Sequence, residues 1–173
     1  MNYRYVGDFP KQTKFQIALR EILERGGVVG GTSAGTAAQP EIMTLWHEYE
    51  DDDGPATAVA AHGLGLFNQA IVEQHFDARS GRLERFTGLL RDNSKLDHLA
   101  GRPDVGIHMR GLAVEERSAL VAQGDHLEVL GSASSHVFLK SNNGRTLTWH
   151  ELNPGERALL KQDNLGVSEL RRK

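Results

Sequence analysis

The chain has 173 residues, 39% of them hydrophobic and 25% charged, which is enough for one domain with a substantial core. Its net charge of -3 gives no electrostatic footprint for nucleic acid or an anionic membrane, and we expect neither as a partner. Cysteine is absent, which excludes disulfides, a cysteine nucleophile and thiolate metal sites. No apolar run has the length of a membrane span, and residues 1–10 lack a signal-peptide core, so the sequence predicts a soluble cytoplasmic protein.

The first predicted elements are a helix, a strand and a glycine-rich turn. Apolar residues recur at helical spacing from Thr13 to Arg25, and Gly26-Gly27 follows as a stop signal. Val28-Val29 is expected to be a short buried strand. The next residues, Gly31-Thr32-Ser33-Ala34-Gly35, match the G-x-S-x-G nucleophile elbow, in which glycines on both sides let a serine stand at the tip of a tight turn. A structural turn built from small residues is the alternative explanation.

The middle of the chain predicts a loop, a strand and a helix. Residues 41–61 are expected to be an insertion or surface loop, whose acidic run at 48–53 is either solvated or a cation site. The segment Ala70-Ile71-Val72-Glu73-Gln74-His75-Phe76 predicts a buried parallel strand that ends in polar residues at a functional edge. A helix then reaches about Asp92. The arginines at its start are either surface residues or a face that binds carboxylates, and they are Arg79, Arg82 and Arg85.

The last third of the chain predicts mostly strands. Residues 92–104 are expected to be a loop, 105–109 a short strand, and 112–116 a strand that ends in two carboxylates. Turn residues at Gly124-Asp125 and Asn142-Asn143-Gly144 predict two hairpins. Residues 156–161 are expected to be briefly helical, and 168–173 to be frayed.

A serine nucleophile needs a base to take its proton and a carboxylate to orient that base. Among 8 histidines, His75 stands out because it directly follows an apolar strand, and Glu115 and Glu116 are each candidates to orient it. The chain order of an α/β-hydrolase would instead combine Asp104 or Asp125 with His126, His136 or His150. Neither a metal nor another cofactor is expected, because the histidines are scattered singly and no H-E-x-x-H pattern occurs.

These segments together resemble the serine peptidase family that contains the cyanophycinases and the aspartyl dipeptidases. The matching stretches are residues 25–35, Gly63-Leu64-Gly65-Leu66, Glu73-Gln74-His75-Phe76 and 114–121. With the residues around them, the resemblance spans residues 13 to about 131. The chain looks most like the cyanophycinase branch, whose motifs run GGTSAGA and DQHF, although Glu73 stands where that branch has an aspartate.

The resemblance implies an α/β fold with a flavodoxin-like (class I glutamine amidotransferase-like) parallel sheet, followed by C-terminal β-hairpins. One domain would span residues 1–173, with its core at 13–140. The family's N-terminal half would be missing, so that the sheet is incomplete on its N-terminal side. The exposed edge would invite self-association into a homodimer.

The resemblance also implies the site. Ser33 would be the nucleophile, His75 the base, Glu116 its carboxylate partner, and Ala34 would offer a backbone N–H to the oxyanion. Substrate would be bound by Glu73, Gln74, Arg79, Arg82 and Arg85. The implied reaction is hydrolysis of β-aspartyl-arginine bonds in a cyanophycin-like peptide or polymer through an acyl-enzyme. The alternatives are an α-aspartyl dipeptidase of the same family, and a non-catalytic, truncated remnant that acts as a binding or interaction module.

Overall fold

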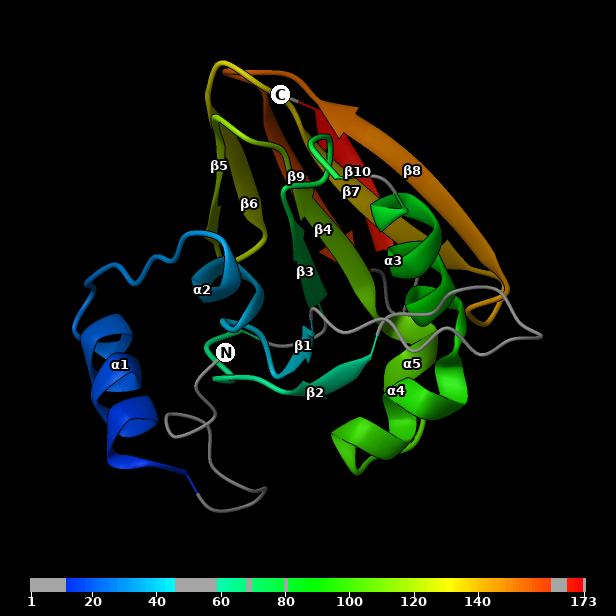
Figure 1. Cartoon of the computed structure of the whole chain (residues 1–173), viewed down its shortest axis with the longest axis horizontal. Helices are drawn as coiled ribbons and strands as arrows, with labels where there is room; N and C mark the ends of the chain where they lie inside the picture. The colour runs from blue at the N-terminus through cyan, green and yellow to red at the C-terminus, as the bar shows by residue number, and fades with distance from the viewer. Residues whose placement is uncertain (1–11, 46–58, 68–69, 80, 163–167, 173) are drawn as a thin grey trace.

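The strands that the structure describes form two four-stranded sheets and one two-stranded ribbon, with short helices beside them (Figure 1). The computed structural model describes residues 12–45, 59–67, 70–79, 81–162 and 168–172. The chain is α/β with mixed sheets, because one strand pair is parallel among the strands described and the other pairs are antiparallel.

The first sheet carries the residues of the candidate site at one edge. Its strand order is β3-β4-β7-β8, with bounds Ala70–Gln74, Arg110–Val114, Ser135–Ser141 and Thr146–Leu152. β3 and β4 are parallel, and Gln74 pairs with Val114 at their carboxyl ends. Both predicted strands are therefore confirmed, and the residues that follow them leave the sheet side by side.

The second sheet is antiparallel, in the order β10-β9-β6-β5. Its strands are β5 (Ser118–Gln123), β6 (His126–Gly131), β9 (Arg157–Gln162) and β10 (Ser168–Arg172). The two predicted hairpins, β5–β6 and β7–β8, are confirmed. The expected helix at 156–161 and the frayed end at 168–173 are wrong: Ala158 and Leu160 alternate into the core, as in a strand, and β10 pairs with β9.

Helix α1 (Lys14–Glu24) confirms the first predicted helix. Thr13 caps it in a capping box with Gln16, and Gly26 follows with a φ of 78°. The helix stands apart from the two sheets in Figure 1. The predicted strand after it is wrong, because Val28-Val29 is an irregular segment and Val28 is 89% exposed. No described strand pairs with this segment, so its two valines have no sheet to join.

Helix α3 (Arg82–Arg91) is confirmed, but two expectations after it are wrong. Residues 93–100 form helix α4 (Asn93–Ala100), and residues 105–108 form helix α5 (Val105–His108) instead of a strand. α4 begins where the Asp92 carboxylate accepts the Lys95 backbone N–H at 3.0 Å, and it buries Leu96 and Ala100.

The expected loop at 41–61 is partly wrong. β1 (Ile42–Thr44) is buried and pairs with β2 (Ala60–His62) as an antiparallel ribbon. The acidic run at 48–53 lies outside the described residues.

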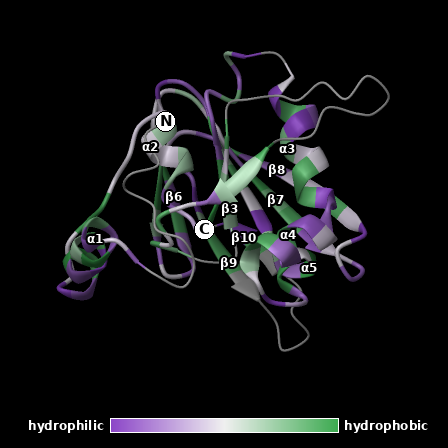
Figure 2. Cartoon of the chain, turned by 60° about the horizontal axis from the view of Figure 1, so that its bottom comes forward, coloured by the Kyte–Doolittle hydropathy of each residue, from purple (hydrophilic) through white to green (hydrophobic). Residues whose placement is uncertain are grey.

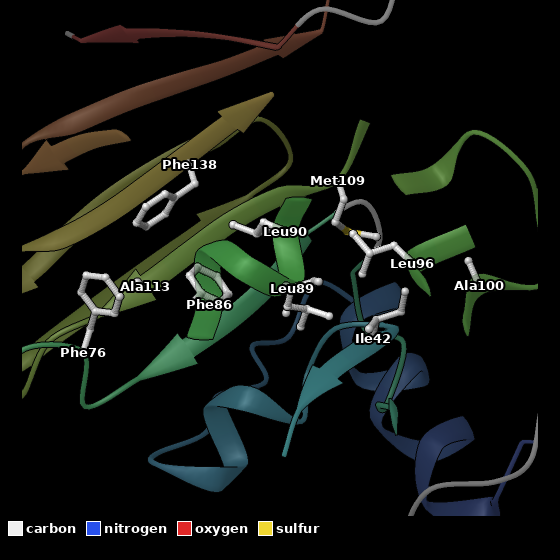
Figure 3. Packing of buried hydrophobic residues seen from close by; sticks show 11 residues of the cluster. Ile42, Phe76, Phe86, Leu89, Leu90, Leu96, Ala100, Met109, Ala113 and Phe138 are labelled. Carbon is white, nitrogen blue, oxygen red and sulfur yellow. The ribbon is translucent and has the colours of Figure 1, made fainter. Parts of the chain in front are cut away.

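Apolar side chains fill both faces of the first sheet. On one face, β3, β4 and β7 pack against α3 and α4 through a cluster that includes Ile71, Phe76, Phe86, Leu96 and Phe138 (Figure 3). On the other face, the first sheet packs against the second through Val72, Leu112, Val129, Val137 and Leu160. Figure 2 shows that α3 and α4 carry both hydrophilic and hydrophobic residues. This packing on both faces fixes β3 and β4, which position the site.

Candidate active site

Ser33 lies at the tip of a strained turn. Its φ of 52° and ψ of -123° are unusual for a residue with a side chain, and α2 (Ala34–Ala37) begins directly after it. The Thr36 hydroxyl donates to the Gly31 carbonyl at 2.7 Å and closes the turn across Ser33. A strained turn directly before a helix is typical of a nucleophile elbow, in which the serine hydroxyl points away from the backbone.

The two glycines of the elbow have different roles. A Cβ atom on Gly31 would lie 2.2 Å from the Gly35 carbonyl oxygen, whereas a Cβ atom on Gly35 would meet no atom within 4 Å. The expectation that both positions need a glycine for steric reasons thus holds at Gly31 alone. The close approach of the two backbones excludes any side chain there.

His75 and Glu116 complete a hydrogen-bonded chain with Ser33. His75 follows β3 in a left-handed conformation, with a φ of 50°, and Glu116 lies two residues beyond β4. His75 Nε2 lies 3.0 Å from Ser33 Oγ, and His75 Nδ1 lies 2.9 Å from Glu116 Oε1. The side chains of His75 and Glu116 are 25% and 49% exposed, so a ligand can reach these hydrogen-bonded side chains from solvent.

The partners of His75 define its tautomer. An ionised carboxylate only accepts hydrogen bonds, so Nδ1 carries the proton that is donated to Glu116. Nε2 then has a lone pair to accept the Ser33 hydroxyl proton. The arrangement can deprotonate the serine, which is the first chemical step of a serine hydrolase.

Other candidates for the base and its partner lie elsewhere. Glu115, the second acid at the end of β4, binds the buried His136 and not His75. Asp104 precedes α5 and Asp125 lies in the β5–β6 turn. His126 and His150 belong to strands β6 and β8. The structure therefore brings together Ser33, His75 and Glu116 from three separate segments.

Two of the three arginines bind a carboxylate of the chain itself. Glu73 is fully buried on β3, and both Arg82 Nη1 and Arg85 Nη2 form ion pairs with it, the second at 3.1 Å. Burial lowers the pKa of Arg82, against the opposing effect of Glu73. Arg82 and Arg85 do share one helix face, as their spacing indicates, but that face is turned inward.

The remaining candidates for substrate binding differ in exposure. Arg79 lies in the turn before α3 and is exposed. Gln74 is buried, and its amide oxygen has no hydrogen-bond partner among the residues described. The Ala34 N–H, beside Ser33, likewise donates to no acceptor that the structure describes.

Sequence reasoning missed Asp77. Its carboxylate accepts the backbone N–H of Glu116 at 2.9 Å, which links the turn after β3 to the end of β4. The only signal was its position two residues after His75, which is too common a pattern to single out an acid.

In the described part of the chain, no group of three or more histidine, aspartate or glutamate side chains is placed to hold an ion. Every helix described there is too short or too polar to cross a bilayer.

Comparison with known proteins finds a distant similarity. A cyanophycinase from Geminocystis herdmanii (strain PCC 6308) is 30% identical to the chain over 118 residues. The aligned part is 67% of this chain and 38% of the relative, so the chain spans well under half of that protein. No model of a known protein family matches the chain. The similarity relates the chain distantly to a cyanophycinase.

Proposed function

We propose that the chain is part of a serine peptidase of the cyanophycinase type, in which Ser33, His75 and Glu116 form the catalytic triad. The observation that carries the proposal is the continuous hydrogen-bonded chain from Glu116 through His75 to Ser33. The strained backbone of Ser33 supports it, because such strain is concentrated at functional sites.

The reaction would proceed through an acyl-enzyme. Ser33 Oγ attacks the scissile amide carbonyl while His75 Nε2 takes the hydroxyl proton, and Glu116 stabilises the imidazolium that forms. The Ala34 N–H donates to the oxyanion of the tetrahedral intermediate. His75 then gives its proton to the leaving amine, and a water molecule, activated by His75, hydrolyses the ester.

The fold proposed for the complete enzyme is a flavodoxin-like sheet. The parallel pair β3–β4 supports this proposal, because its carboxyl ends carry the base and its acid partner. β3 is an edge strand of the described sheet, so the strands of a larger parallel sheet would continue beside it.

The proposed substrate is a peptide with a β-aspartyl-arginine bond, as in cyanophycin. Arg79, being exposed, is the arginine that we assign to a substrate carboxylate. Arg82 and Arg85 would instead support the site by holding Glu73 in place. An α-aspartyl dipeptidase remains the alternative within the same chemistry.

A fluorophosphonate probe tests the proposal without a known substrate. The intact mass of the wild-type chain should increase by one adduct, located on Ser33, and the Ser33→Ala variant should remain unlabelled. Circular dichroism of both proteins controls for folding. A folded wild-type chain that takes no adduct would reject catalysis by this chain and favour the interaction module. With labelling established, hydrolysis of β-aspartyl-arginine against α-aspartyl peptides identifies the specificity.

A further inference from the structure

A second carboxylate–imidazole pair lies one residue along the chain from the triad. Glu115 precedes Glu116, and its Oε1 lies 2.7 Å from Nε2 of His136 on β7. His136 is 3% exposed and the Glu115 side chain is 19% exposed, so this pair is less exposed than His75 and Glu116. The triad makes no direct use of it.

Trp149 fixes the protonation of this second imidazole. The indole Nε1–H can only donate, and it lies 3.0 Å from His136 Nδ1, which must therefore accept. The ring proton is then on Nε2 and is donated to Glu115. A neutral imidazole with a hydrogen bond on each side has one orientation, which makes His136 a rigid element of the sheet.

His136 contacts the chain neighbours of both His75 and Glu116. Its ring packs against the ring of Phe76, the residue after His75, with centroids 5.1 Å apart. Its Nε2 holds Glu115, the residue before Glu116. Thus one buried ring touches the segment that carries the base and the segment that carries its acid partner.

Glu115 is held on its other side as well. Its Oε2 accepts the Ser134 backbone N–H at 3.2 Å, so both carboxylate oxygens have donors. The segment after β4 is thereby tied to the start of β7 through side chain and backbone. Without the bond to His136, Glu115 would lose the partner that ties it to the packing around Phe76.

We propose that His136 is a positioning residue that sets the distance between His75 and Glu116. It acts through Phe76 on one side and Glu115 on the other, and does not touch the reacting atoms. The consequence for catalysis rests on the proposed function, but the consequence for geometry does not.

Three variants test the proposal. His136→Phe keeps a ring against Phe76 and removes both hydrogen bonds. His136→Gln is the conservative variant, because its amide N–H can still donate to Glu115. Val137→Ala is the matched control: Val137 is the next residue of β7, is equally buried, and faces the other sheet. Crystal structures of the variants give the distance from His75 Nδ1 to Glu116 Oε1. Fluorophosphonate labelling gives the reactivity of Ser33, and the midpoint of thermal unfolding gives the stability of each variant.

In His136→Phe we expect the distance from His75 Nδ1 to Glu116 Oε1 to exceed hydrogen-bond reach. Labelling of Ser33 should then slow about 10- to 100-fold, which is the cost of misplacing a catalytic group by about 1 Å. His136→Gln should recover part of both, and Val137→Ala should lower the unfolding midpoint with the distance unchanged. An unchanged distance in a folded His136→Phe, or equal losses in all three variants, would overturn the proposal. An unlabelled wild type would reject the proposed function, and the crystallographic distance would still decide this inference.

Discussion

The carboxylate of Asp77 accepts the backbone N–H of Glu116 at 2.9 Å. Two residues before Asp77, the imidazole of His75 donates to the Glu116 side chain at 2.9 Å. The turn after β3 thus holds Glu116 at its backbone and at its carboxylate. Because Glu116 is half exposed, these bonds and not burial fix its position.

Loss of the Asp77 carboxylate should therefore lower the reactivity of Ser33 in the proposed triad more than it lowers the stability of the fold. We expect Asp77→Ala to slow fluorophosphonate labelling of Ser33 about tenfold, equivalent to roughly 1.4 kcal/mol of transition-state stabilisation. Asp77→Asn keeps an oxygen that can accept the Glu116 N–H and should label at nearly the wild-type rate. Equal rates for Asp77→Ala and Asp77→Asn would show that this hydrogen bond does not position the triad.

The two glycines on either side of Ser33 lead to a separate prediction. Gly31→Ala should disrupt the turn and abolish labelling, because its Cβ atom would lie 2.2 Å from the Gly35 carbonyl oxygen. Gly35→Ala meets no atom within 4 Å and replaces glycine in a helix, so it should unfold at the wild-type temperature or above. Thermal unfolding and intact-mass labelling measure both. A Gly31→Ala protein that is fully labelled would contradict the close approach described here.

The ends of β3 and β4 were predictable from sequence because their signals are local. Each strand is an apolar run that stops at polar residues, and parallel strands bring such ends to one edge. The strand expected at Val28-Val29 was wrong for the opposite reason. Two valines form a strand only with a neighbour to pair with, and the described residues provide none.

The arginines of α3 and the helix α4 show two further limits of prediction from sequence. The spacing of Arg82 and Arg85 predicts a shared face but not its direction, which depends on the buried Glu73 on another element. In the segment that forms α4, few apolar residues mark the helix. Its start depends on the cap at Asp92, a signal that polar loops also contain.

The buried ion pairs of Glu73 should matter for stability. Glu73→Gln removes the carboxylate that Arg82 and Arg85 both contact and leaves two guanidinium charges in the core, which should cost about 3–5 kcal/mol. Glu84→Gln, at an exposed position of α3, the helix that carries Arg82 and Arg85, is the control and should cost far less. Urea unfolding at neutral pH measures both variants. A small cost at Glu73 would mean that the two arginines find other partners.

Lys140 gives a prediction for the pH dependence of stability. It is 4% exposed and donates to Asn93 Oδ1 at 2.7 Å and to the Gly106 carbonyl at 2.6 Å. Burial lowers its pKa from 10.5 to about 8, so between these values the unfolded chain holds a proton that the folded chain has released. The free energy of unfolding should therefore rise with pH across this window, by up to about 1.4 kcal/mol per pH unit from this group.

The contribution of Lys140 is isolated by comparing variants across the same window. Lys140→Met removes the contribution of this side chain to the free energy of unfolding, which increases between pH 8 and 10.5. The wild type should therefore gain stability relative to the variant as pH increases. Lys14→Met, at an exposed lysine of α1, should instead parallel the wild type. Urea unfolding at several pH values gives the three curves. Parallel curves for wild type and Lys140→Met would show that the ammonium group keeps its ordinary hydration in the folded chain, which its two short hydrogen bonds and its burial argue against.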